Sequence, residues 1–191
     1  IILGALALLL AGIVIVSTSR FNRQVEAEIA ALLRAANSGP DRSFSAADLD
    51  GLPEPMRSYL RRCVKDGQPA IRSVRLKQTG QMRLKPEQAW MPFRAEQYYT
   101  PDPPAMLWRA WVKYMPLVRV VGRDTYARQQ GHMLIKLFST LPVVDARGPK
   151  IAVGAFVRLI AEFVWFPAAL ANNPRLRWET VDARTVRATA A

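Results

Sequence analysis

The feature that most constrains this chain is its N-terminal run, Ile1 to Val16, which contains no polar side chain. As a helix this run spans roughly 24 Å, against about 30 Å for the hydrocarbon core of a bilayer. The three residues Ser17, Thr18 and Ser19 would supply part of the remaining length. We interpret residues 1–19 as a transmembrane anchor or signal segment, which predicts a single-pass membrane protein.

Two alternatives to an uncleaved anchor remain open. Ser17 and Ser19 form a small-x-small pattern, which a secretory signal uses as its cleavage site. A buried core helix is the second alternative, but a helix of a soluble protein usually keeps a polar stripe, and residues 1–16 have none. We favour the uncleaved anchor.

The orientation of the anchor depends on the charges that flank it. Arg20 and Arg23 come after the apolar run, and taken alone they would hold the C-terminal side in the cytoplasm. N-terminal single anchors usually carry their basic residues in front and export the domain on their C-terminal side, so we expect an extracytoplasmic domain. The chain begins with Ile1 and ends inside an expected strand, so we also expect a fragment that is truncated at its C-terminus.

Residues 20–50 are expected to form an amphipathic helix and a linker, and residues 51–191 an α+β domain that is incomplete at its C-terminus. Apolar residues recur at helical spacing over 23–36, and the helix could continue from the anchor as a stalk. A second helix is expected within 52–64, where one face carries Met56, Tyr59, Leu60 and Cys63. This spacing predicts that Cys63 is a packed core thiol.

From Ile71 the apolar period changes to two, which is typical of strands with one buried face. Strands are expected over 71–85, 93–99, 108–114, 118–128 and 132–138, and a final hairpin over 175–181 and 184–189. The proline-containing stretch 141–149 is expected to be a loop. Consecutive strands flanked by helices predict the α+β class, with a curved antiparallel sheet packed with helices in a half-barrel-like form.

A further helix is expected over residues 150–165, between the loop and the final hairpin. Phe156, Leu159, Ile160 and Phe163 fall on one stripe, which we expect to pack against the sheet. Arg158 and Glu162 are four residues apart, within reach of an ion pair. That pair is either a surface pair or a buried one that ties the helix to the sheet.

The charge balance is strongly basic, with 27 Lys and Arg against 15 Asp and Glu and a net charge of +12. Such an excess favours an anionic partner, although a GC-rich genome also produces many arginines. The residues on the solvent face of the first strand that we expect to contact an anionic membrane surface are Arg72, Arg75, Lys77, Arg83 and Lys85. No aromatic residue interrupts these charges, so nucleic-acid binding is not expected.

Large aromatic residues gather on the expected strands and near the last helix. Those that we single out as candidate ligand-binding residues are Trp90, Tyr99, Trp108, Trp111, Tyr114 and Trp165. Some of them point to opposite faces of a strand, so they cannot all belong to one core. The alternative is that they pack within the domain and bind nothing.

No pattern in the chain indicates catalysis, a metal or a cofactor. The single cysteine excludes an internal disulfide and a cysteine-built zinc site, and no glycine-rich phosphate loop is present. His132 is expected to be a surface histidine near a strand end. An enzyme would require at least two of a set of side chains to meet in one cleft, namely His132, Asp124, Asp145, Glu162 and Arg158. We therefore do not expect an enzyme.

Four ordered stretches, 52–62, 91–99, 143–149 and 159–170, resemble an uncharacterised bacterial membrane-anchored family, a domain of unknown function. The resemblance spans residues from Leu52 to the end of the chain, and it implies no catalytic residue. The fold it implies is similar, more loosely, to the half-barrels that carry lipoproteins or lipids outside the inner membrane.

We therefore expect a membrane-anchored extracytoplasmic binding module for a lipid or another hydrophobic ligand. The alternative is a structural or interaction domain that binds anionic membrane through its basic face. The expected partners are membrane lipids and a hydrophobic small molecule, and the sequence does not indicate an oligomeric state.

Overall fold

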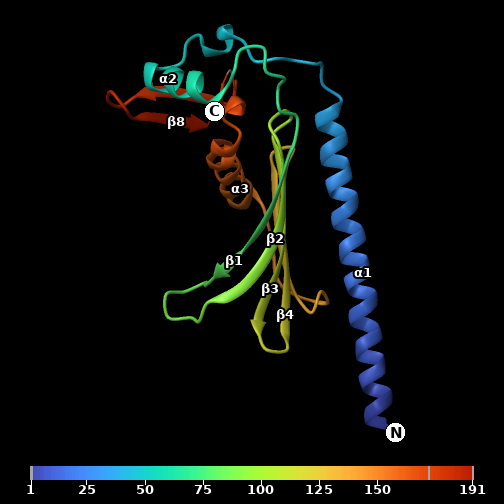
Figure 1. The fold of residues 1–191 in the computed structure, drawn as a ribbon. Coiled ribbons are helices and arrows are strands. Elements are labelled where there is room, and N and C mark those ends of the chain that lie inside the picture. The colour runs from blue at the N-terminus through green and yellow to red at the C-terminus, as the bar shows by residue number, and fades with distance from the viewer. Residues whose placement is uncertain (1, 172, 191) are drawn as a thin grey trace.

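The computed structural model describes residues 2–171 and 173–190 of the chain. Its first element, α1, is one continuous helix over Ile2–Asn37, so the apolar run and the amphipathic helix are a single rod (Figure 1). Within the described residues, α1 is the helix that is long and apolar enough to cross a membrane, judged by length and composition alone. Its buried residues, Phe21, Val25, Ile29 and Ala36, all lie in its second half.

Two short helices come after α1, the 3-10 helix η1 over Ala46–Leu49 and the α-helix α2 over Glu54–Cys63. Met56 and Leu60 of α2 are buried, and Val64, directly after it, is buried as well. This stripe of residues four apart places Cys63 at the edge, where its thiol is exposed. The prediction of a packed thiol is therefore wrong, because α2 buries a narrower stripe than its apolar spacing indicated.

The main sheet has six strands in the order β1-β2-β3-β4-β5-β6, and every neighbouring pair is antiparallel. The strands span Val74–Met82, Met91–Thr100, Ala105–Met115, Val118–Ala127, Gln130–Leu137 and Leu141–Arg147. The sheet is an open meander, which confirms the α+β class with an antiparallel sheet. Figure 1 shows β1 and the lower part of β2 curving away from the other strands, on the side where α3 lies.

Strand β6 corrects the sequence prediction, which made 141–149 a loop. It pairs with β5 and carries a register shift beside Pro142. Proline cannot donate to a ladder, but an edge strand at an irregularity tolerates it. Most of its residues are exposed, so it lacks the apolar signal that identified the other strands.

The second half of the chain contains α3 over Pro149–Ala161, then the 3-10 helices η2 over Glu162–Trp165 and η3 over Pro167–Leu170. Strands β7, Leu176–Thr180, and β8, Val186–Ala190, form a separate two-stranded sheet, which confirms the predicted hairpin. Leu159 and Phe163 are fully buried, and Phe156 and Ile160 pack against the same core. The expected apolar stripe is confirmed.

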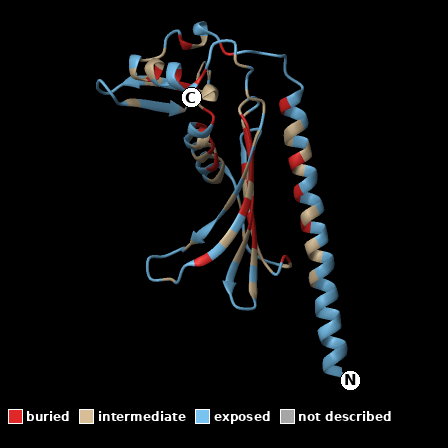
Figure 2. Ribbon diagram, in the orientation of Figure 1, coloured by how far each residue is buried: buried red, intermediate tan, exposed pale blue. Residues whose placement is uncertain are grey.

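The sheet has two faces with different cover. We call the face towards α3 the inner face and the face towards α1 the outer face. Inner-face residues such as Tyr99 and Met106 join a core with α2, α3 and η3. Outer-face residues such as Leu107 and Val121 pack against Phe21, Val25 and Ile29 of α1. Figure 2 shows the buried residues concentrated in the upper half of the sheet and of α1.

Candidate functional site

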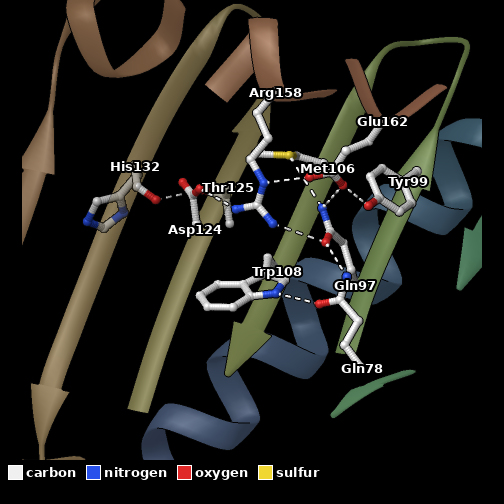
Figure 3. Close-up of polar contacts among 10 residues, drawn as sticks. All are labelled: Gln78, Gln97, Tyr99, Met106, Trp108, Asp124, Thr125, His132, Arg158 and Glu162. Atoms are coloured by element: carbon white, nitrogen blue, oxygen red, sulfur yellow. Dashed lines mark hydrogen bonds and ion pairs between the residues drawn. The ribbon is translucent and has the colours of Figure 1, made fainter. Parts of the chain in front are cut away.

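A polar cluster lies beneath α3 on the inner face, and Arg158 is its centre (Figure 3). The Arg158 guanidinium donates through Nε to Glu162 Oε1 at 2.8 Å and through Nη1 to Asp124 Oδ2 at 3.1 Å. Its Nη2 donates to Gln97 Oε1 at 3.1 Å, and its Cζ lies 5.2 Å from the centre of the Trp108 ring. Arg158 and Glu162 therefore form a pair that ties the helix to the sheet, the second of the two alternatives.

Glu162 is held from three directions. Besides Arg158, Gln97 Nε2 donates to its Oε2 at 2.8 Å, and the Tyr99 hydroxyl donates to the same oxygen. On the sheet, Trp108 Nε1 donates to Gln78 Oε1 at 2.9 Å. The cluster therefore joins β1, β2, β3 and β4 to the end of α3.

Burial shifts the pKa of both carboxyl groups in this cluster. It raises the pKa of Asp124 above its ordinary value, although the Arg158 charge opposes the shift. Burial also raises the pKa of Glu162, and the hydrogen bond from Gln97 opposes that shift. Asp124 Oδ1 is buried without a hydrogen-bond partner among the described residues. The other polar atoms of the Arg158, Asp124 and Glu162 side chains have hydrogen-bond partners within the cluster, so the cluster is suited to bracing α3.

A second charged cluster lies on the outer face and includes His132. Its Nε2 lies 2.7 Å from Asp145 Oδ1 on β6, and its Nδ1 contacts the Arg123 guanidinium of β4. Arg123 in turn donates to Glu28 Oε1 of α1 at 2.6 Å, and its side chain is only 3% exposed. The His132 side chain is 14% exposed, so the prediction of a surface histidine is wrong. The Arg123 and Asp145 side chains, on the two neighbouring strands, lie against it.

A parallel arrangement holds Arg109 of β3. Its Nη1 donates to Glu26 Oε1 of α1 at 2.7 Å and its Nη2 donates to Glu96 Oε2 at 2.9 Å. Glu96 also accepts from Arg75 at 3.0 Å. The hydrogen bonds from both arginines lower the pKa of Glu96, against the opposing effect of its burial. Glu26 and Glu28 thus supply the negative charges that let α1 lie over a sheet face rich in arginine.

The five residues of which an enzyme would need at least two in one cleft lie in two groups. Asp124, Arg158 and Glu162 lie on the inner face, whereas His132 and Asp145 lie on the outer face. The sheet separates the two groups. Across the described residues, His, Cys, Asp and Glu side chains form no group of three or more that could hold a metal ion.

The six aromatic candidates are not gathered at one place. Tyr99 is fully buried in the core beneath α3, and Trp108 lies on the inner face under Arg158. Trp111 lies on the outer face, between the guanidinium groups of Arg94 and Arg109.

The other three aromatic candidates are exposed. Tyr114 lies near the end of β3, Trp90 is 55% exposed in the turn before β2, and Trp165 is 67% exposed at the end of η2. Ligand binding by the six as one set has no geometric support.

The five basic candidates are also spread out. Arg72 lies at the C-terminal end of α1, where it donates to the carbonyl oxygens of Asn37 and Gly39 and pairs with Asp41. The Arg75 and Lys77 side chains project from the outer face of β1. Arg83 and Lys85 lie beyond the end of that strand, in the turn before β2.

Part of the inner face has a composition that sequence reasoning did not single out. In the half of the sheet that α3 leaves uncovered, Phe93 lies opposite Val112, Val112 opposite Val120, and Val120 opposite Leu137. We call these four residues, with Met82 on the β1 edge, the open inner patch. All five are partly exposed, and none is charged.

The next row towards α3 has small residues at its centre. Ala95 lies opposite Ala110, and Ala110 opposite Gly122. The alternation along each strand was visible in the sequence. The alignment of these residues into uncharged rows was not visible, because it depends on the register between strands.

Two open hollows lie near the end of the sheet that carries the turns β2–β3 and β4–β5. The first, of about 560 Å³, lies between α1 and the turns β2–β3 and β4–β5, with Leu32, Met106 and Arg128 among its lining residues. The second, of about 500 Å³, adjoins it and is lined in part by Phe44 and Arg72. No aromatic candidate lines either hollow.

Comparison with known proteins gives a family but no activity. No curated protein matches the chain, and no solved structure matches it. One family model, described as a family of unknown function, matches residues 42–191, which is most of the chain and nearly all of the region after α1. The chain therefore belongs to the DUF6544 family.

Proposed function

We propose that this chain is a membrane-anchored domain that binds the hydrocarbon part of a lipid on its open inner patch. The observation that carries the proposal is an uncharged, partly exposed row of apolar side chains, formed by Phe93, Val112, Val120 and Leu137. On the other face, the neighbouring positions Arg94, Lys113, Arg119 and Lys136 are basic. Only one face of this half of the sheet is thus suited to an acyl chain.

The position of the patch favours a ligand that comes from a membrane. It lies at the end of the sheet that points towards the N-terminal half of α1 (Figure 1). At the other end of the patch, Arg158 and Trp108 close the inner face beneath α3. Each methylene buried from water contributes about 0.8 kcal/mol, so the binding free energy should grow with the length of chain that the patch covers.

The test is photo-crosslinking with a photoactivatable fatty acid in proteoliposomes that contain the full chain. We expect labelled peptides from β2, β3, β4 and β5, besides the anchor. Met82→Arg should lower this sheet labelling severalfold, because it places a charge at the edge of the patch. Gln81→Arg is the matched control, since it adds the same charge to the same strand at an exposed outer-face position. Labelling confined to residues 2–19 would refute the proposal.

The domain is further proposed to face the extracytoplasmic side. Cys63 is the only cysteine of the chain and its thiol is exposed, so it reports the side directly. A membrane-impermeant thiol reagent added to intact cells should modify Cys63. Modification only after the membrane is opened would place the domain in the cytoplasm.

A second candidate function is binding to anionic lipid through basic residues. One observation favours it, namely that Arg83 and Lys85 lie in the turn at the end of the sheet nearest the anchor. Arg72 does not fit this function, because it is engaged at the C-terminal end of α1.

A further inference from the structure

The two ends of the main sheet carry different turns. We call the end with the turns β1–β2, β3–β4 and β5–β6 the anchor end. Large apolar side chains are exposed in or beside all three of these turns, namely Leu84, Trp90, Tyr114, Met115, Leu117, Phe138, Leu141 and Val143. The turns β2–β3 and β4–β5 at the far end contain no exposed large hydrophobic residue among those described.

Basic residues accompany the exposed apolar ones at the anchor end. Over residues 83–90, 113–119 and 136–141 the basic residues are Arg83, Lys85, Lys113, Arg119 and Lys136, and the acidic residue is Glu87. Arg83 stacks over Trp90 at 4.7 Å, so a cation and an indole form one unit. We call these five basic residues, together with Leu84, Trp90, Met115 and Leu117, the tip surface.

The packing of α1 sets the height of the tip surface along the anchor. Phe21 packs with Val121 and Leu134, and Lys136 lies 5.9 Å from the centre of its ring. The residues of α1 before Phe21 are not buried against the sheet. Phe21 therefore marks the last level at which α1 is buried against the sheet, and the half-buried Val14, Ser17 and Thr18 lie beyond it at helical spacing.

Strand geometry then gives the reach of the β3–β4 turn beyond that level. Leu117 is four residues from Val121, which is roughly 13 Å along a strand at about 3.3 Å per residue. The same distance along α1 is about nine residues at 1.5 Å each. The β3–β4 turn, which contains Leu117 (88% exposed), thus lies level with the apolar run 1–16 (Figure 1). A bilayer that surrounds the apolar run must meet this turn.

We infer that the tip surface docks on an anionic phospholipid bilayer beside the anchor. The basic side chains of the tip surface pair with lipid phosphates, and its apolar side chains enter the interface, where tryptophan is enriched in membrane proteins. This inference deepens the second candidate function, binding to anionic lipid through basic residues, and rests on it, but it does not depend on lipid binding at the open inner patch. It places the anchor end of the sheet in contact with the membrane, so that the open inner patch borders lipid.

The test uses the full chain in proteoliposomes, with a fluorescent probe at one engineered thiol. Cys63→Ser removes the native thiol, and Leu117→Cys carries an NBD probe at the tip surface. Ser38→Cys carries the same probe beyond the far end of α1. Doxyl-labelled lipids should quench the probe at position 117 strongly in bilayers that contain phosphatidylglycerol, and should leave the probe at position 38 unchanged.

Charge reversal tests the recognition of anionic lipid. Each basic residue near an anionic surface strengthens association about fivefold, so Lys85→Glu with Arg119→Glu should lower the ratio of docked to undocked domain by more than tenfold. Lys65→Glu with Arg62→Glu is the matched control, because both residues are exposed and lie in and just after α2.

Two outcomes would overturn the inference. A probe at position 117 that is as little quenched as one at position 38 would show that the tip surface does not touch the bilayer. Equal quenching in phosphatidylcholine alone and in the phosphatidylglycerol mixture would refute recognition of anionic lipid. Quenching that is strong only with phosphatidylglycerol, and lost in Lys85→Glu with Arg119→Glu, would support it.

Discussion

At Gly131 the backbone of β5 lies close against the backbone of α3, and substitution there should loosen the inner face. A Cβ atom added at Gly131 would lie 2.7 Å from both the N and the Cα of Ala152, in the first turns of α3. It would also lie 2.8 Å from the carbonyl carbon of Ile151. All three atoms are backbone, so a rotamer change cannot relieve the overlap, and the helix or the strand has to move.

The size of the effect is set by this geometry. An ordinary carbon–carbon contact lies at about 3.5–4.0 Å, so Gly131→Ala forces a shift of roughly 1 Å between α3 and β5. Insertion of a methyl group into a closely packed interface typically costs about 1–3 kcal/mol. We expect Gly131→Ala to lower the free energy of unfolding by that amount. The shift should also strain the hydrogen bonds of Arg158 to Asp124 and Gln97, which span the same interface.

Gly154 provides a matched control within α3. A Cβ added there meets no atom within 4 Å. Alanine in a helix interior is more favourable than glycine by about 0.5–1 kcal/mol, so Gly154→Ala should stabilise the protein. The two glycine-to-alanine changes should therefore have opposite signs.

Denaturant unfolding of the full chain in detergent micelles, followed by tryptophan fluorescence, measures both changes. The midpoint for Gly131→Ala should fall, and that for Gly154→Ala should rise, without a change in slope. A loss below about 0.5 kcal/mol for Gly131→Ala would show that α3 does not lie this close to β5. So would a greater loss for Gly154→Ala than for Gly131→Ala.

Three further predictions use unfolding measurements on the same preparation. Phe163→Ala should lower the free energy of unfolding by about 3–5 kcal/mol, because Phe163 is fully buried. Val157→Ala, on the exposed side of α3, should lower it by less than about 1 kcal/mol, and equal losses would contradict this packing. Burial raises the pKa of Glu162 in the folded protein, so the stability of the wild type relative to Glu162→Gln should rise as pH falls from neutral through that pKa. This gain in stability should reach its full size below the ordinary pKa of about 4.3, and the opposite slope would refute the assignment. Arg123→Met should lower the free energy of unfolding by about 1–3 kcal/mol, because it leaves the charge of Glu28 unpaired. Arg119→Met on the same face should change it by less than about 0.5 kcal/mol, and similar values for both variants would show that α1 is not held through Arg123.

The amino-acid sequence by itself determined the features that depend on local contrast between apolar and polar residues. The unbroken apolar run predicts the first half of α1, because a helix without a polar stripe has no face for water. Alternation over residues 74–82 predicts β1, and the stripe of Leu159 and Phe163 predicts the buried side of the last helical region. These patterns are visible in the sequence because each element has one buried side, whichever other element covers that side.

Only the tertiary structure decided which element covers which face. Arg109 and Arg123 lie in strands and read as solvent-facing positions, yet their side chains are 9% and 3% exposed. Burial of such groups requires opposite charges, and Glu26 and Glu28 on α1 supply them from far away in the sequence. The periodicity within one strand contains no information about a partner so distant in the sequence.

Strand register is the second property that the sequence left undetermined. Phe93, Val112, Val120 and Leu137 come from four strands, and each was an ordinary apolar residue of an alternating segment. Their alignment into one uncharged row depends on hydrogen bonding between strands, which a shift of one residue would reverse from face to face. The tip surface has the same origin, because the sheet brings together three turns whose exposed residues are remote in the chain. Long-range pairing, rather than local pattern, therefore decided the position of both the open inner patch and the tip surface.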